Sequence, residues 1–131
     1  MASVVINGDT SGSVTLSAPT AAGSTTITLP TSTGNALVDI ARSLTPNGYV
    51  KLSNGLIIQW GTSATIGANG STTVTFPIAF TTVFNVVAGK FGGIAAQDGG
   101  SGALSVSNTS FVAHNGDNVS SAAVSWIAIG I

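Results

Sequence analysis

The segment NGYVKLSNGLIIQWG, residues 47–61, predicts a β-hairpin. Residues 49–52 and 56–60 are rich in apolar, β-prone side chains, and Ser53, Asn54 and Gly55 separate them. An Asn-Gly pair between two such runs favours a tight turn, because both residues tolerate a positive φ.

The second strand of this hairpin alternates between two faces. Leu56, Ile58 and Trp60 share one face, and Ile57 and Gln59 share the other. Since each face carries apolar side chains, we expect the hairpin to be covered on both sides, by the chain's own sheet or by another subunit.

Three blocks of sequence carry a resemblance to a known family. They are the pattern G-Y-x-K-L-x-x-G-L-I-I-Q-W-G at residues 48–61, VTFPIAF at 74–80 and WIAIGI at 126–131. In this order and spacing they resemble the C-terminal domain of bacteriophage tail-fibre proteins, over roughly residues 44–131. The last residue of that family is often aromatic, where this chain has Ile131.

The resemblance implies a trimeric, β-rich receptor-binding tip in the tail of a virion, assembled in the host cytoplasm. The implied partners are two further copies of the chain, other tail or virion proteins, and a host-surface glycan or outer-membrane protein. Two alternatives stay open: a structural virion component, such as a capsid decoration or fibre cap, and a monomeric carbohydrate-binding module.

Composition excludes several classes of protein. Of 131 residues only seven are charged, while 44% are hydrophobic, and disorder needs the opposite balance. Ser, Thr, Asn and Gly must solvate the surface, so we expect much apolar surface to lie in subunit contacts. A net charge of −1 without a basic cluster argues against binding to nucleic acid. The chain has no cysteine for a disulfide and no apolar run of membrane-spanning length.

Residues 1–40 are interpreted as a β-rich shaft. The segments SVTLSAPT and TITLPTST look like a degenerate repeat of one strand followed by a turn with Pro. A single strand of this kind cannot bury its apolar face alone. In a trimer, three chains would pack four side chains around a common axis: Val14, Leu16, Ile27 and Leu29. The alternative is a flexible linker rich in Ser, Thr and Gly.

Residues 36–44 predict a short helix at the neck between shaft and head. Leu37, Ile40, Ala41 and Leu44 recur at helical spacing. Asn35 would cap its start, and Pro46 follows its end. Such a short helix would need packing partners to be stable.

Residues 41–131 predict an antiparallel β-sandwich head. Apolar or alternating runs at 71–76, 83–88, 104–107, 111–114 and 122–129 indicate short strands, and five Asn-Gly pairs in the chain indicate turns. The last run is apolar on both faces, so we expect a central strand.

The residue inventory argues against an enzyme. The chain has one histidine, no Glu and no Cys, and its four aspartates are scattered. The usual acid–base and nucleophile sets, or the carboxylate pair of a glycosidase, are not present as a pattern. We therefore expect no catalytic residue, no cofactor and no metal. Three copies of His114 on a trimer axis would be able to bind a transition metal, but a hydrogen-bonded histidine at a strand end is the simpler interpretation.

Two loops are the candidates for receptor contact. The glycine-rich segment 88–102 lacks the features of a phosphate-binding loop and exposes a few polar and aromatic side chains. Residues 115–121 add short polar groups able to bind sugar hydroxyls. The predicted receptor-binding residues are Lys90, Phe91, Gln97, Asp98, His114, Asn115, Asp117 and Asn118. The alternative for the glycine-rich segment is a solvated connection without function. Tyr49 and Trp60 would be able to stack on sugar rings, but their place in the hairpin favours packing.

Overall fold

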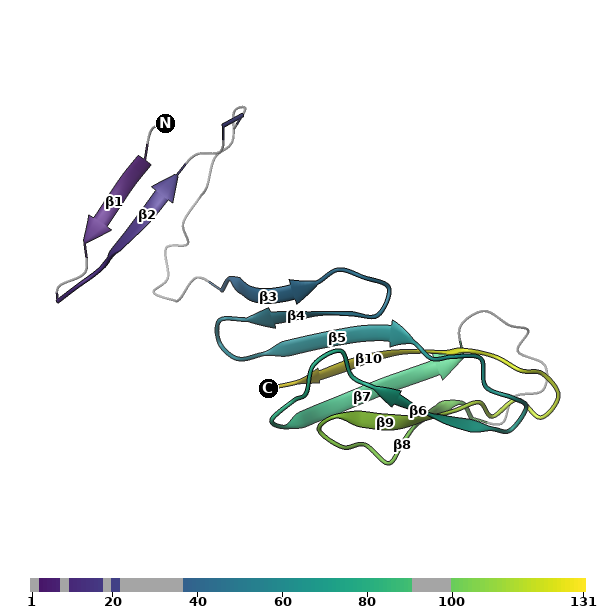
Figure 1. Ribbon diagram of the computed structural model, residues 1–131. Coiled ribbons are helices and arrows are strands. Elements are labelled where there is room, and N and C mark those ends of the chain that lie inside the picture. Colours follow the sequence, from purple (N-terminus) through teal and green to yellow (C-terminus); the bar gives the residue numbers. More distant parts are fainter. Residues whose placement is uncertain (1–2, 8–9, 18–19, 22–36, 91–99) are drawn as a thin grey trace. The chain divides into compact units, whose positions relative to one another are not determined.

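The computed structural model describes residues 3–7, 10–17, 20–21, 37–90 and 100–131. The chain forms two compact units, Met1–Asn35 and Ala36–Ile131. In the first unit, β1 (Ser3–Asn7) pairs antiparallel with β2 (Ser13–Ser17), as Figure 1 shows. β2 confirms the strand predicted in the segment SVTLSAPT. The segment at residues 25–29 lies outside the described residues.

The second unit contains two antiparallel sheets (Figure 1). The five-stranded sheet has the order β3 (Asp39–Ser43), β4 (Gly48–Leu52), β5 (Ile57–Thr62), β10 (Val124–Gly130) and β7 (Val83–Lys90). The three-stranded sheet has the order β6 (Ser71–Thr75), β9 (Ser110–His114) and β8 (Gly102–Leu104). Within the described residues the protein is entirely β, without a helix.

The predicted hairpin is confirmed as β4 and β5. Gly55 has φ 91°, a left-handed conformation that glycine adopts without a steric penalty. The Asn54 Oδ1 accepts a hydrogen bond of 3.0 Å from the Leu56 N–H, and the Leu52 N–H donates to the Leu56 carbonyl at 2.8 Å. The turn therefore sets the register of the two strands.

The predicted helix at residues 36–44 is wrong. Residues 39–43 form β3, which pairs with β4, and Leu37, Ile40 and Leu44 are all more than half exposed. The helical spacing of these side chains does not correspond to a packed face. An isolated helix of two turns has only marginal stability. As strand β3, the same residues form backbone hydrogen bonds with the adjacent strand β4. The expected boundary between residues 40 and 41 falls inside this strand.

The core lies between the two sheets. Trp126 of β10 packs edge-on against Phe111 of β9, with ring centroids 5.6 Å apart, and against Phe76, which follows β6, at 5.7 Å. The other buried apolar residues of this cluster are Ile57, Ile66, Phe80, Ala113, Val124 and Ala128. As predicted for the last strand, β10 is central: it pairs with β5 on one side and β7 on the other.

One polar side chain lies inside this core. Gln59 of β5 is fully buried, and its amide pairs with the backbone of Ile78. The Nε2 donates to the Ile78 carbonyl at 2.8 Å, and the Oε1 accepts from the Ile78 N–H at 3.0 Å. Gln59 thereby acts as a strand partner for a segment outside the ladders, so that no polar group of the pair remains unsatisfied.

The outer face of the five-stranded sheet is apolar. Ile127 of β10 lies between Trp60 of β5 and Val87 of β7, and Ile129 lies beside Ile58. Val87 is 59% exposed, Ile127 43% and Ile129 37%. We call these five side chains the outer apolar face. Neighbouring exposed apolar groups of this kind indicate an interaction surface.

Candidate functional site

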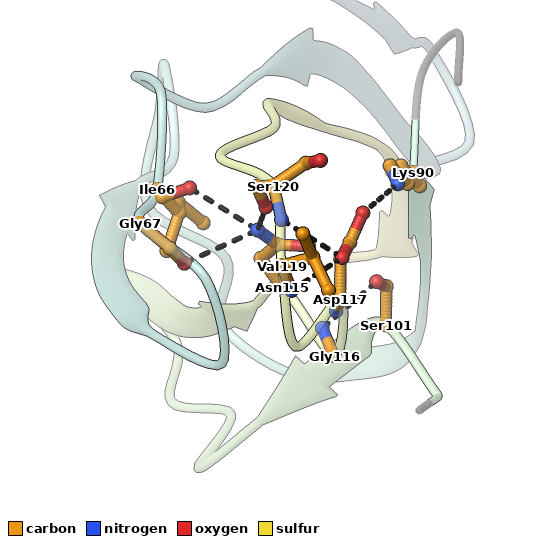
Figure 2. A network of polar contacts seen from close by, with 9 residues as sticks. All are labelled: Ile66, Gly67, Lys90, Ser101, Asn115, Gly116, Asp117, Val119 and Ser120. Carbon is orange, nitrogen blue, oxygen red and sulfur yellow. Dashed lines mark hydrogen bonds and ion pairs between the residues drawn. The ribbon is translucent and has the colours of Figure 1, made fainter. Parts of the chain in front are cut away.

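The turn between β9 and β10 forms hydrogen bonds with three other parts of the second unit: the segment between β5 and β6, the end of β7 and the residue just before β8 (Figure 2). We call residues 115–120 the anchor turn. The Asn69 N–H donates to the Asp117 carbonyl at 2.6 Å, and the Asn115 N–H donates to the Gly70 carbonyl at 2.9 Å. Asn69 has φ 50°, and asparagine tolerates this left-handed conformation better than most residues. The turn before β6 is thus joined to the anchor turn.

Asn115 holds the anchor turn together from inside. Its side chain is fully buried. The Nδ2 donates to the carbonyl oxygens of Ile66 (3.1 Å), Gly67 (3.1 Å) and Ser120 (3.0 Å), as the dashed lines in Figure 2 show. The Oδ1 accepts from the Asp117 N–H at 3.2 Å. This amide closes the turn and links it to the segment that follows β5.

Asp117 is the ionic centre of the anchor turn. Its Oδ1 accepts from the backbone N–H groups of Val119 (2.8 Å) and Ser120 (2.9 Å). Its Oδ2 lies 2.5 Å from the Nζ of Lys90, and both side chains are largely buried (Figure 2). The Lys90 hydrogen bond, followed by those from Val119 and Ser120, lowers the pKa of Asp117 from 3.8 to about 2. At neutral pH the carboxylate is therefore ionised.

The anchor turn also fixes both ends of the glycine-rich connection between β7 and β8. On one side Lys90, the last residue of β7, binds Asp117. On the other side the Ser101 Oγ accepts from the Gly116 N–H at 3.0 Å (Figure 2). The anchor turn therefore binds Lys90 and Ser101, on the two sides of this connection, and loops carried by a rigid scaffold often contain binding residues.

A second feature is a pocket along β7, which is the end strand of the five-stranded sheet within the described residues. It has a volume of about 360 Å³ and eight lining residues, all uncharged: Thr82, Val83, Phe84, Asn85, Val86, Val106, Ser107 and Asn108. Phe84 is 59% exposed. The pocket thus combines an exposed aromatic ring with two amide side chains.

A family model for the C-terminal region of gp53-like tail fiber proteins matches residues 51–131. This chain belongs to the gp53-like tail-fibre family. The match begins at the last two residues of β4 and continues to the end of the second unit, so it includes β5 to β10 and the anchor turn but not β3. A search of curated proteins finds no match.

Solved structures of pyocin fibers resemble this gp53-like tail-fibre chain. An N-truncated R2-type pyocin tail fiber is 29% identical in sequence, with a TM-score of 0.64. The match covers 76% of this chain and 39% of the pyocin chain. A C-terminal part of the P. aeruginosa R2 pyocin fiber is 30% identical in sequence, with a TM-score of 0.64, and the match covers 75% of this chain and 26% of the pyocin chain. The structure of a P. aeruginosa R1 pyocin fiber is 29% identical in sequence, with a TM-score of 0.56, and the match covers 75% of this chain and 29% of the pyocin chain. This chain therefore spans well under half the length of those fibres.

The predicted receptor-binding residues of this tail-fibre domain occupy different environments. Asn115 and Asp117 are buried and hold the anchor turn, Lys90 is largely buried beside Asp117, and Asn118 is exposed. His114 is half-buried, with its Nδ1 3.0 Å from the Ser71 Oγ. Phe91, Gln97 and Asp98 lie outside the described residues. The role of all eight residues in receptor contact stays a prediction.

The predicted trimer-packing residues lie in the first unit. Leu16 of β2 faces Val4 of β1 across the pair, and both are more than 60% exposed. Val14 is opposite Ile6 in the same register. Ile27 and Leu29 lie outside the described residues, so the packing around an axis stays a prediction. Across the ranges that the structure does describe, no cluster of His, Asp, Glu or Cys is able to hold a metal, and no helix is able to span a membrane.

The sequence analysis did not identify the pocket, including its aromatic residue Phe84 and its two amide residues, Asn85 and Asn108. The run at residues 83–88 indicates a strand, and it does not show that the strand lies at a sheet edge. The signal was the Phe-Asn pair inside an otherwise aliphatic run, because a polar amide beside an aromatic ring is unusual in a covered strand.

Proposed function

We propose that this chain is the receptor-binding tip of a phage-type tail fibre, attaching to a host-surface glycan or outer-membrane protein without cleaving it. The observation that carries the proposal is the family match over residues 51–131. The similarity to C-terminal parts of pyocin fibres over about three quarters of the chain supports it. The protein would be part of the virion tail, contacting other tail proteins and assembled in the host cytoplasm.

A non-catalytic role is consistent with the chemistry of the described residues. The buried carboxylate, Asp117, accepts three hydrogen bonds and has a pKa near 2. A general acid needs a pKa near the working pH, so Asp117 is unsuited to donate a proton. Asp39 pairs with Arg42 at 2.7 Å on the surface of β3. Each of these two carboxylates is thus paired with a basic side chain. Nothing in the inventory suggests a nucleic-acid ligand.

We infer that the tip is a homotrimer of β-sandwich heads. The outer apolar face crosses three adjacent strands, β5, β10 and β7, and two of its residues, Ile127 and Val87, are substantially exposed. The β1–β2 hairpin likewise leaves Val4, Ile6 and Leu16 exposed. Contacts between copies would bury both surfaces. Three receptor sites on one tip would raise avidity without any new contact in a single site.

Binding of the labelled, full-length chain to a panel of bacterial strains tests this function. The proposal predicts saturable binding to at least one strain, competed by unlabelled chain. A variant with residues 91–99 replaced by a Gly-Ser segment of equal length should lose that binding, whereas Val119→Ala, an exposed change in the anchor turn, should retain it. A trimer that binds no strain would instead favour a structural fibre cap, and a monomer that binds sugar would favour the carbohydrate-binding module.

A further inference from the structure

We propose that the pocket beside β7 is a binding site for a neutral saccharide unit of the receptor, with Phe84 as its stacking platform. The inference rests on the proposed attachment function and names the ligand class and the residues that would recognise it. It concerns a place on the head distinct from the anchor turn.

One wall of the pocket comes mainly from the end strand of the five-stranded sheet, and the other comes from the connection between β8 and β9. β7 is the last strand of the five-stranded sheet and β8 the last of the three-stranded sheet. Residues 82–86 form one wall, and residues 106–108, which follow β8, form the other. An edge strand presents backbone N–H and C=O groups outside the ladder. Such groups are natural partners for ligand hydroxyls.

Phe84 is exposed because the pairing of β7 is irregular at this point. Ile129 of β10 is opposite Asn85, but the next residue, Gly130, is opposite Val83. Phe84 is thus the extra residue of a β-bulge. Bulges re-aim side chains and occur often beside functional sites. An aromatic ring that is 59% exposed at such a position has an apolar face available to the C–H groups of a sugar ring.

The opposite wall is fixed before any ligand binds. The Asn108 Nδ2 donates to the Thr81 carbonyl at 2.8 Å, and the Asn108 carbonyl accepts from the Phe80 N–H at 2.9 Å. Because the Nδ2 is held in this way, the amide orientation is set and the Oδ1 remains an acceptor at a defined place. Ser105, just before this wall, has φ 45°. Strained backbone of this kind in a non-glycine residue is found most often at functional sites.

The chemistry of the lining selects a neutral, hydroxyl-rich ligand. None of the eight lining residues carries a charge, so an anionic or cationic group would find no counter-ion. An aromatic ring and the Asn85 and Asn108 amides match a ligand with one apolar face and several hydroxyls. The volume of about 360 Å³ lies at the small end of ligand pockets, ~300–1,000 Å³. A mono- or disaccharide unit fits this description.

The test uses the full chain and three variants: Phe84→Ala, Asn85→Ala and, as the control, Leu104→Ala. Leu104 is also exposed, at 50%, but does not line the pocket. The probes are immobilised neutral oligosaccharides of hexoses and N-acetylhexosamines, with sialylated and phosphorylated glycans alongside. We expect the chain to bind one or more neutral glycans, the two pocket variants to lose about tenfold or more in affinity, and Leu104→Ala to match the parent.

Binding of the same variants to host cells separates this inference from the proposed function. If the parent chain binds cells and Phe84→Ala binds them equally well, the saccharide site is wrong while the attachment function stands. Binding to anionic glycans alone would also overturn the site. If Phe84→Ala dissociates the native assembly, Phe84 is an interface residue and the proposal fails. If the parent chain binds neutral glycans through Phe84 but no cells, the attachment function fails and the site stands.

Discussion

The Lys90 Nζ lies 2.5 Å from the Asp117 Oδ2, and this ion pair joins the end of β7 to the turn between β9 and β10. The side chains are 14% and 6% exposed. Partial burial reduces solvent screening of an ion pair and leaves either charge costly if its partner is removed. The pair therefore positions one stem of the glycine-rich connection, while the Ser101 Oγ, bound to Gly116, positions the other.

The ion pair makes the stability of the second unit depend on pH. The pKa of Asp117 is about 2 in the folded chain and near 3.8 without its partners. Between these values the unfolded chain binds more protons, so the free energy of unfolding falls as the pH drops from about 4 to about 2. The contribution is complete above the unfolded pKa. Urea unfolding at pH 7, 4, 3 and 2 would measure it.

Asp117→Asn should remove much of this pH dependence and lower the stability at pH 7, because Lys90 loses its carboxylate. Asp39→Asn is the matched control. Asp39 forms an exposed pair with Arg42, with side chains 37% and 61% exposed, and such pairs contribute little. Equal effects of the two substitutions at pH 7 would contradict the central role of Asp117.

Asn115→Ala should destabilise the second unit by ~2–4 kcal/mol, since it leaves several buried backbone groups without a partner. The carbonyls of Ile66, Gly67 and Ser120 lose their donor, and the Asp117 N–H loses its acceptor. Asn118→Ala, at an exposed position of the same turn, should change the free energy of unfolding by less than about 0.5 kcal/mol. Thermal and urea unfolding of both variants provide the comparison, and a stable Asn115→Ala would refute the assigned role.

Gln59→Leu should cost ~1–3 kcal/mol, although it makes the core more apolar, because the Ile78 N–H and C=O would both be left unpaired. The bonds in question measure 3.0 and 2.8 Å. The control is Thr73→Val, an exposed, nearly isosteric change on β6. A neutral or stabilising Gln59→Leu would show that another group or water replaces the amide.

If copies of the chain associate through the outer apolar face, the native mass should be that of a trimer. Three copies of the 12.8 kDa chain give about 38 kDa, the closed assembly expected for a fibre. Ile127→Asp should shift the mass measured by light scattering toward that of one chain, because a charge would be buried between copies. Leu104→Asp, at an exposed residue of the other sheet, should leave the mass unchanged. A parent chain that runs as a monomer would remove the basis for the trimer.

The sequence predicted the parts of the fold that depend on local chemistry. The Asn54-Gly55 turn and the two apolar faces of the last strand correctly gave the β4–β5 hairpin and the central position of β10. The helix at residues 36–44 was wrong because pairing with β4 overrides a weak helical pattern. Sequence alone also could not show that Asn115 and Asp117 face inward, since short polar residues in a turn look alike whether they cap the turn or meet solvent.

The pocket depended on relationships that no local pattern carries. Phe84 is exposed because the pairing of β10 with β7 slips by one residue at Gly130. That slip involves residues 83–85 and 129–130, which are far apart in the chain. Asn108 forms hydrogen bonds with residues 80 and 81, and its separation of 27 residues from Thr81 is also beyond any local pattern. Turn chemistry predicts a connection at residues 108–110, but it does not predict which part of the fold this connection contacts.

The most direct test of the central claim is a competition experiment on host cells. Cells of a strain that binds the labelled chain are saturated with the purified chain and then exposed to particles that carry it as their tail fibre. The account predicts that the particles no longer adsorb, and that chain with residues 91–99 replaced fails to block them. Undiminished adsorption to cells saturated with the chain would contradict the claim that this chain is the attachment tip.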